Sequence, residues 1–198
     1  MTQSFDAAYY RRFYVNRHTQ AVSRVELERR ATSVGALLRQ LDIPVARILD
    51  MGCGLGWMRR PLLRTFPEAR YVGVEVSEHL CSRMGWIQGS LTSYEPRGQF
   101  DLIICHDVMQ YLDERDAKRA FKNLARWCRG ALYFHAPTVK DWRENVDPNC
   151  SDTHVHLRSA AWYRKQLSQH FVHAGIGVYV RHGVPFMQWE LERAENAR

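Results

Sequence analysis

The sequence lacks long hydrophobic runs, linkers and a disulfide pattern. Its apolar runs are far shorter than the ~20 residues that a membrane helix needs. The first residues carry no basic region followed by an apolar one, so we expect no export. Five cysteines, an odd number, favour free thiols in a reducing cytoplasm. No repeat or Pro/Gly/Ser-rich tract interrupts the 198 residues, which are 45% hydrophobic, and this predicts a single domain with a full core.

The net charge of +7, from 28 basic and 21 acidic residues, is spread along the chain. Arginines such as Arg29, Arg30, Arg59 and Arg60 lie on predicted helix faces. Nucleic-acid binders usually interleave basic residues with stacking aromatics, and no such stripe stands out here. The charge therefore predicts a solvated basic surface, with RNA binding as the alternative.

A glycine-rich turn follows the first predicted strand. The apolar run from Ile48 ends at Asp50, and glycines follow at 52, 54 and 56. Such a turn lets a ligand approach bare backbone where a parallel strand meets a helix. The dinucleotide fingerprint G-x-G-x-x-G needs its third glycine where Trp57 stands, and a carboxylate at Asp50 would repel a pyrophosphate. A ligand with a cationic amino group fits the turn better.

The next apolar strand, Tyr71 to Glu75, ends in an acid about 20 residues after the glycines, the spacing expected for a ribose contact. The glycine turn and this strand together resemble the S-adenosylmethionine-dependent methyltransferases of the Rossmann-like (class I) superfamily. The resemblance extends over about residues 45 to 192. It implies S-adenosyl-L-methionine as cofactor and S-adenosyl-L-homocysteine as product.

The resemblance also implies cofactor contacts. Glu75 would accept hydrogen bonds from the ribose hydroxyls, and Val76 would lie near the adenine. Ser90 stands where many relatives carry an aspartate that binds the adenine amino group. The strand from Phe100 to His106 would pass beside the methionine moiety. The expected contacts are Asp50, Gly52, Cys53, Gly54, Gly56, Glu75, Val76, Gly89, Ser90, Leu91, His106, Asp107 and Val108.

One motif is missing at the end of this fourth strand. Methyltransferases of DNA amino groups resemble one another by an Asp/Asn-Pro-Pro-aromatic run at this place, whereas residues 105–108 read Cys-His-Asp-Val. The sequence therefore favours methyl transfer to an oxygen or nitrogen of a small molecule. An RNA-directed methyltransferase, or a non-catalytic protein that binds the cofactor or a partner, is the alternative.

The element pattern predicts an α/β/α sandwich with a mostly parallel seven-stranded sheet and a C-terminal antiparallel hairpin. Residues 1–42 form a helical extension or lid, and residues 43–198 form the cofactor-binding core. The predicted helices span residues 19–41, 57–66, 77–83, 113–128 and 159–171, with Pro61 delaying or kinking the second and Gly130 stopping the fourth. The predicted strands are 48–50, 71–75, 100–106, 131–136, 176–181 and 185–191, and residues 85–91 contain a further strand and the turn that follows it.

The segment from residue 9 to 17 is dense in aromatics and arginine. It is either a helix that packs its aromatics on the sheet or a lid over the cofactor. For the lid, Tyr10, Tyr14 and Arg17 are the candidates to bind the methionine carboxylate.

Three histidines are candidate general bases, because histidine titrates near neutral pH. They are His106 and His135 at predicted strand ends, and His154 on the loop after the fifth strand. Transfer by proximity alone, without a base, is the alternative. Cys150, His154 and His156 lack the paired spacing of metal ligands, so no metal is expected.

Overall fold

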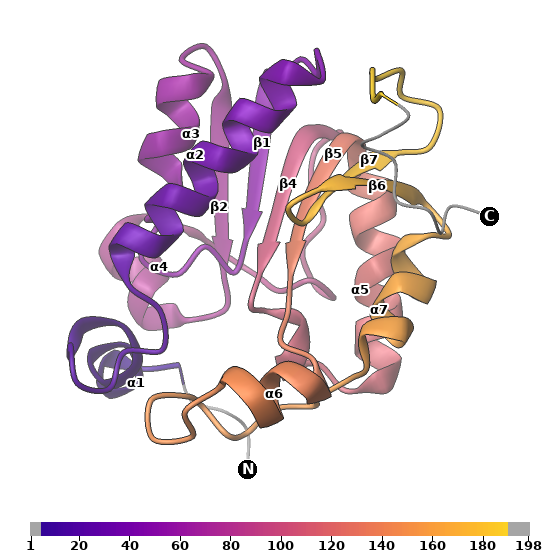
Figure 1. Ribbon diagram of the computed structural model, residues 1–198. Helices are drawn as coiled ribbons and strands as arrows, with labels where there is room; N and C mark the ends of the chain where they lie inside the picture. The colour runs from indigo at the N-terminus through magenta and orange to yellow at the C-terminus, as the bar shows by residue number, and fades with distance from the viewer. Residues whose placement is uncertain (1–4, 190–198) are drawn as a thin grey trace.

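The computed structural model describes residues 5–189 and contains one seven-stranded sheet of order β3-β2-β1-β4-β5-β7-β6 (Figure 1). Strands β1 to β5 run parallel, whereas β7 is antiparallel to both of its neighbours, β5 and β6. The strands are β1 Arg47–Met51, β2 Arg70–Glu75, β3 Ile87–Gln88, β4 Phe100–His106, β5 Cys128–His135, β6 Phe171–Gly175 and β7 Val178–Arg181.

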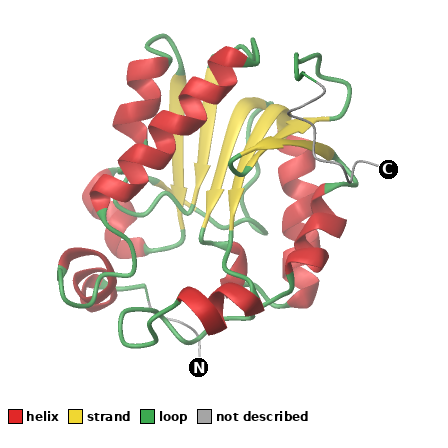
Figure 2. Cartoon of the chain, viewed as in Figure 1, coloured by secondary structure: helices red, strands yellow, loops and turns green. Residues whose placement is uncertain are grey.

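Helices cover both faces of this sheet and its carboxyl end (Figure 2). Helices α2 and α3 lie on one face, and α5 and α7 lie on the other; α1 and α6 lie beyond the carboxyl ends of the parallel strands. The α-helices are α1 Ala7–Tyr10, α2 Arg24–Gln40, α3 Arg59–Thr65, α4 Glu78–Met84, α5 Glu114–Trp127, α6 Val139–Asn145 and α7 Ala160–Leu167. A π-helical turn, η1 Arg11–Val15, follows α1, and a 3-10 turn, η2 Met109–Tyr111, follows β4.

Two apolar cores form because the central strands are buried on both faces. In β1, Leu49 and Met51 pack into the core under α5 and α7, whereas Ile48 packs into the core under α2 and α3. A smaller cluster joins Tyr9, Tyr10 and Phe13 of the N-terminal segment to Leu80 of α4. The carboxyl ends of the parallel strands β1, β2, β4 and β5 lie at the same end of the sheet, beyond which α1 and α6 lie.

The predicted fold class is confirmed, but the C-terminal hairpin lies earlier in the chain than predicted. Its turn is Gly175-Ile176-Gly177, where all three residues have positive φ, so Ile176 does not begin a strand. The first hairpin strand begins at Phe171, which the sequence assigned to a helix; that helix ends at Leu167. The predicted strand 185–191 is wrong for residues 185–189, which form no strand, and residues 190 and 191 lie outside the described part.

Other boundaries shift for identifiable reasons. Helix α2 begins only at Arg24, because Ser23 caps it by accepting a hydrogen bond from the Glu26 amide. The predicted late start of the helix containing Pro61 is confirmed. Gly130 does not stop a helix; it lies inside β5, where a Cβ would approach the Asp101 carbonyl oxygen to 2.3 Å.

The five cysteines are free. Within residues 5–189, no helix has the length and apolar character needed to cross a membrane.

Candidate functional site

The glycine turn after β1 presents bare backbone. Gly52, Gly54 and Gly56 all have positive φ, a region in which side chains are strained. A Cβ at Gly52 would lie 2.3 Å from Val108, whereas a Cβ at Gly54 would have no heavy atom within 4 Å. The turn is thus packed at its base and open at Gly54, where a ligand can approach the main chain.

Glu75, at the end of β2, is buried and ties the glycine turn to the strand. Its Oε2 accepts a hydrogen bond from the Gly54 amide at 2.8 Å. Its Oε1 accepts from the amides of Val76 at 2.8 Å and Ser77 at 3.1 Å. The carboxylate thereby fixes the turn, and within the described residues Oε2 has a single hydrogen-bond donor.

Asp50 is buried below the turn and contacts protein groups. Its Oδ2 accepts a hydrogen bond of 2.5 Å from the Tyr71 hydroxyl. Burial, together with the charge of Glu75, raises the pKa of Asp50 to about 7 against the opposing effect of this hydrogen bond.

A large cavity of about 1270 Å³ lies at the carboxyl ends of β1, β2 and β3. This volume exceeds the roughly 300–1,000 Å³ of ordinary small-molecule sites. Six of the expected cofactor contacts line it: Gly52, Val76, Gly89, Ser90, Leu91 and Val108. Asp50, Cys53, Gly54, Gly56 and Glu75 lie behind or beside these residues and do not line it.

A second cavity of about 390 Å³ lies beyond β4 and β5. His106, Asp107, His135 and Tyr14 line it, among other residues. Tyr111 and Val155 line both cavities. The two cavities therefore adjoin, with η2 and the segment after α6 forming the wall between them.

The N-terminal segment covers both cavities. Phe5 lines the larger cavity, and Tyr9 and Tyr14 line the smaller one. The Ser77 hydroxyl donates a hydrogen bond of 2.5 Å to the Phe5 carbonyl oxygen. Tyr10 is buried in the cluster with Leu80 and lines neither cavity. The remaining candidate, Arg17, is exposed and lines neither.

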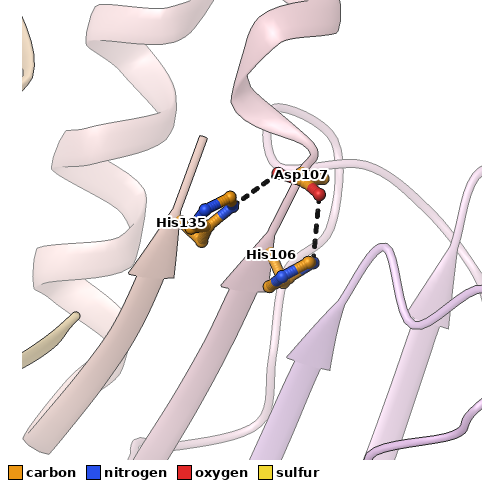
Figure 3. A group of neighbouring side chains, drawn as sticks. All are labelled: His106, Asp107 and His135. Atoms are coloured by element: carbon orange, nitrogen blue, oxygen red, sulfur yellow. Dashed lines mark hydrogen bonds and ion pairs between the residues drawn. The ribbon is translucent and has the colours of Figure 1, made fainter. Parts of the chain in front are cut away.

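His106, Asp107 and His135 form one group, in which Asp107 contacts both histidines (Figure 3). The register of β4 and β5 pairs His106 with His135, and the two rings stack with centroids 4.8 Å apart. His135 Nδ1 lies 2.7 Å from Asp107 Oδ1, and His106 Nδ1 lies 3.4 Å from Asp107 Oδ2. Asp107 has φ +54°, an uncommon conformation that concentrates at functional sites.

The environment of this group shifts the pKa values of Asp107 and His106. Burial alone would raise the pKa of Asp107, but His106 and the hydrogen bond from His135 outweigh it and lower the pKa to about 2. Asp107 is therefore ionised and can only accept a hydrogen bond, so His135 Nδ1 is the donor, and in the neutral form of this ring the lone pair lies on Nε2. Burial lowers the pKa of His106, whose Nε2 is buried without a hydrogen-bond partner among the described residues.

One ligand atom from each of His106, Asp107 and His135 lies within 4.8 Å of the others, so the group has metal-ligating composition. The two imidazole planes are inclined by only 13° and are stacked. An ion in the plane of one ring would therefore lie off the plane of the other. The geometry fits an aspartate–histidine hydrogen bond better than a shared ion.

His154 lies apart from this group, at the rim of the larger cavity, with 83% of its side chain exposed. Its Nδ1 is 3.4 Å from the carboxylate of Asp152, which is buried and lines the smaller cavity.

Arg158, which the sequence did not single out, holds the wall between the cavities. Its buried guanidinium donates to the carbonyls of Met109 at 3.2 Å, His156 at 3.1 Å and Leu112 at 2.6 Å. Tyr111 was missed as well, because only the tertiary arrangement places it between two cavities. A buried arginine within a polar loop leaves no periodic signal in the sequence.

Comparisons with known proteins agree with this geometry. Residues 48–130 match a family model described as a methyltransferase domain. The chain is 30% identical over 145 residues to a trans-aconitate 2-methyltransferase of Azoarcus sp. (strain BH72). That alignment covers 63% of this chain and 56% of the relative, so the chain spans little more than half of the relative's length.

Two solved structures share the fold. Magnesium protoporphyrin IX methyltransferase (ChlM) from Synechocystis PCC 6803, with bound SAM, has a TM-score of 0.55 at 18% identity, covering 79% of this chain and 81% of that one. N-methyltransferase NodS from Bradyrhizobium japonicum WM9, in complex with S-adenosyl-L-homocysteine, has a TM-score of 0.56 at 19% identity, covering 79% and 88%. Residues 48–130 therefore match a methyltransferase domain, and the strand order and these two solved methyltransferases show that the chain has a Rossmann-like fold.

Proposed function

We propose that the protein is an S-adenosyl-L-methionine-dependent methyltransferase that acts on an oxygen or nitrogen atom of a small molecule and releases S-adenosyl-L-homocysteine. The observation that carries this proposal is the pair of adjoining cavities at the carboxyl ends of the parallel strands. One is large enough for a nucleoside with an amino-acid tail, and the other contains the Asp107–His135 pair.

The residues of the larger cavity fit the cofactor. Gly54 and Glu75 lie beside the lining of this cavity; the open space at Gly54 allows a ligand to approach, and Glu75 Oε2 retains lone-pair capacity for a ribose hydroxyl. Val76 and Leu91 offer apolar surface for an adenine ring. S-adenosyl-L-methionine supplies, when bound, a methyl group on a sulfonium, which is already an activated donor.

The residues of the smaller cavity activate the acceptor. Asp107 holds the Nδ1–H of His135, so that Nε2 can accept a proton from an acceptor hydroxyl or ammonium group. The N-terminal segment excludes water from this space through Tyr9 and Tyr14. With 40% of its side chain exposed, His135 stays within reach of a ligand.

The domain limits and the location are part of the same proposal. Residues 1–42 are an N-terminal extension of the cofactor-binding core of residues 43–198, and the part that serves as a lid precedes α2. The packing of Tyr9, Tyr10 and Phe13 against Leu80 of α4 supports the lid, whereas α2 packs on the sheet. Five free thiols, three of them buried, support a reducing, cytoplasmic setting.

Titration calorimetry with S-adenosyl-L-methionine, S-adenosyl-L-homocysteine and NADH tests the cofactor. We expect saturable binding of the first two and none of NADH. Release of S-adenosyl-L-homocysteine in the presence of a metabolite extract then tests turnover. Saturation by NADH alone would overturn the proposal, and cofactor binding without any product release would indicate a binding protein.

A further inference from the structure

Trp86 lies between α4 and β3 and lines neither cavity, yet its side chain reaches the glycine turn. The register that pairs Val74 with Ile87 places Trp86 beside Gly73 of β2. A Cβ at Gly73 would lie 2.6 Å from the indole ring. The missing side chain at this position therefore allows the indole to lie across β2 and to approach the turn that follows β1.

The indole holds the glycine turn on the side opposite to Glu75. Trp86 Nε1 donates a hydrogen bond of 2.9 Å to the Gly54 carbonyl oxygen, whereas the Gly54 amide donates to Glu75 Oε2 at 2.8 Å. A Cβ at Gly56 would lie 2.6 Å from the indole, so the ring also packs directly against the last glycine of the turn. Both main-chain polar groups of Gly54 are thus bound by side chains from outside the turn.

A turn with three glycines needs such contacts. Glycine has more backbone freedom than any other residue, so an unrestrained turn would populate several conformations. The apparent affinity for a ligand falls in proportion to the fraction of molecules in the binding conformation. Contacts that order the turn beforehand lower the entropy that ligand binding would otherwise lose.

The same side chain also contacts the N-terminal segment. Trp86 packs against the apolar cluster that joins this segment to α4: Tyr9, Tyr10, Phe13 and Leu80. The Arg59 guanidinium lies over the indole, with Cζ 5.9 Å from the ring centroid. Trp86 therefore connects the two parts of the molecule to which the proposed function assigns the cofactor, the glycine turn and the lid.

We propose that Trp86 is a positioning residue for the cofactor, which holds the glycine turn in its binding conformation and couples the turn to the N-terminal segment. This inference rests on the proposed methyltransferase function and deepens the description of its cofactor site. Because Trp86 lines neither cavity, it acts through Gly54 and not by contact with the ligand.

Trp86→Phe is the test variant, because phenylalanine keeps an apolar ring and removes the N–H group. Trp127→Phe is the matched control: it removes the same atoms from a buried indole that lines neither cavity and whose Nε1 has no hydrogen-bond partner among the described residues. Calorimetry with S-adenosyl-L-homocysteine on the full chain compares the two variants. We expect Kd to rise at least about fivefold in Trp86→Phe and less than about twofold in Trp127→Phe. Hydrogen exchange over residues 7–15 should become faster in Trp86→Phe alone.

NMR of the unchanged full chain with isotope-labelled tryptophan provides a second measurement, which decides the matter if Trp86→Phe does not fold. The indole N–H signal of Trp86 is identified by its proximity to Gly56. We expect this signal to shift when S-adenosyl-L-homocysteine binds, because the ligand acts on the turn to which the N–H donates, and the Trp127 signal to stay in place.

Three results would overturn the inference: unchanged affinity in Trp86→Phe, an equal loss of affinity in both variants, or no shift of the Trp86 signal on binding. Failure of the unchanged protein to bind S-adenosyl-L-homocysteine would instead overturn the proposed function.

Discussion

The hydroxyl groups of Tyr9 and Tyr111 lie 2.8 Å apart, although 102 positions separate the two residues in the chain. Their hydrogen bond joins the N-terminal segment to the turn that follows β4. The Phe5 ring packs edge-on against both tyrosine rings, at centroid distances of 5.0 and 5.2 Å. The N-terminal segment is therefore attached to the wall that the two cavities share.

Tyr9→Phe should loosen this attachment, because it leaves a partly buried hydroxyl on Tyr111 without its partner. We expect unfolding free energy to fall by about 1 kcal/mol and S-adenosyl-L-homocysteine to dissociate several-fold faster. Stopped-flow dissociation and hydrogen exchange over residues 7–15 measure the two effects. Tyr179→Phe, on β7 away from both cavities, is the control. Equal effects in both variants would contradict the role of the N-terminal segment as a lid.

Gly54→Ala and Gly52→Ala should separate the contribution of the glycine turn to cofactor affinity from its contribution to folding stability. A methyl group at residue 54 has open space around it, so we expect a stability loss of about 1–2 kcal/mol from the left-handed backbone alone. The same methyl group projects where the cofactor backbone contact is proposed, so affinity should fall at least tenfold in calorimetry.

A methyl group at residue 52 would overlap Val108, so Gly52→Ala should destabilise the fold more than Gly54→Ala does. Thermal melts of both variants without ligand provide the comparison. Full cofactor affinity in Gly54→Ala would remove this turn from the binding site.

Asp107→Asn should lower kcat by about 10²–10⁴-fold while leaving cofactor affinity nearly intact. Asparagine tolerates the positive φ of this position, so folding is expected to survive. The amide of asparagine no longer favours a proton on Nδ1 of His135, so Nε2 loses its role as the atom that accepts a proton from the substrate. Steady-state kinetics and calorimetry check the two parts, and an unchanged kcat would leave proximity as the mechanism.

Asp50→Asn should stabilise the protein in a pH-dependent way. The pKa of Asp50 is raised to about 7 in the folded state, so ionisation favours unfolding as pH rises above the ordinary value of 3.8. The gain in unfolding free energy of the asparagine variant should be absent below pH 3.8, increase up to about pH 7 and then stay constant. Its upper limit is about 4 kcal/mol. Denaturant titrations at pH 5 and pH 8 measure it; equal gains at both would contradict the raised pKa.

The architecture could be predicted because its signals are local. Buried parallel strands are continuous apolar runs, and the glycine turn and Glu75 follow them at fixed spacing. The hairpin was misplaced because Gly177 and Gly183 are equally plausible turn residues in the sequence, and only the packed structure shows that Gly175 to Gly177 makes the turn.

The candidate site was predicted only as separate residues. His106, Asp107 and His135 were all named, but the sequence does not contain the register that brings residue 107 to residue 135. The smaller cavity depends on residues from α2, η1, α6 and the segment after α6, so its composition is a property of the tertiary structure.

Arg158 determines which part of the walls around the two cavities can open. One guanidinium binds carbonyls on both sides of the wall, from Met109 and Leu112 in the turn and from His156 in the facing segment. Hydrogen bonds from a charged group cost more to break than the neutral bond between two tyrosine hydroxyls. The turn after β4 and the segment that contains His156 should therefore move together. A ligand should enter and leave past the N-terminal segment, because the hydrogen bond between Tyr9 and Tyr111 is the weaker contact.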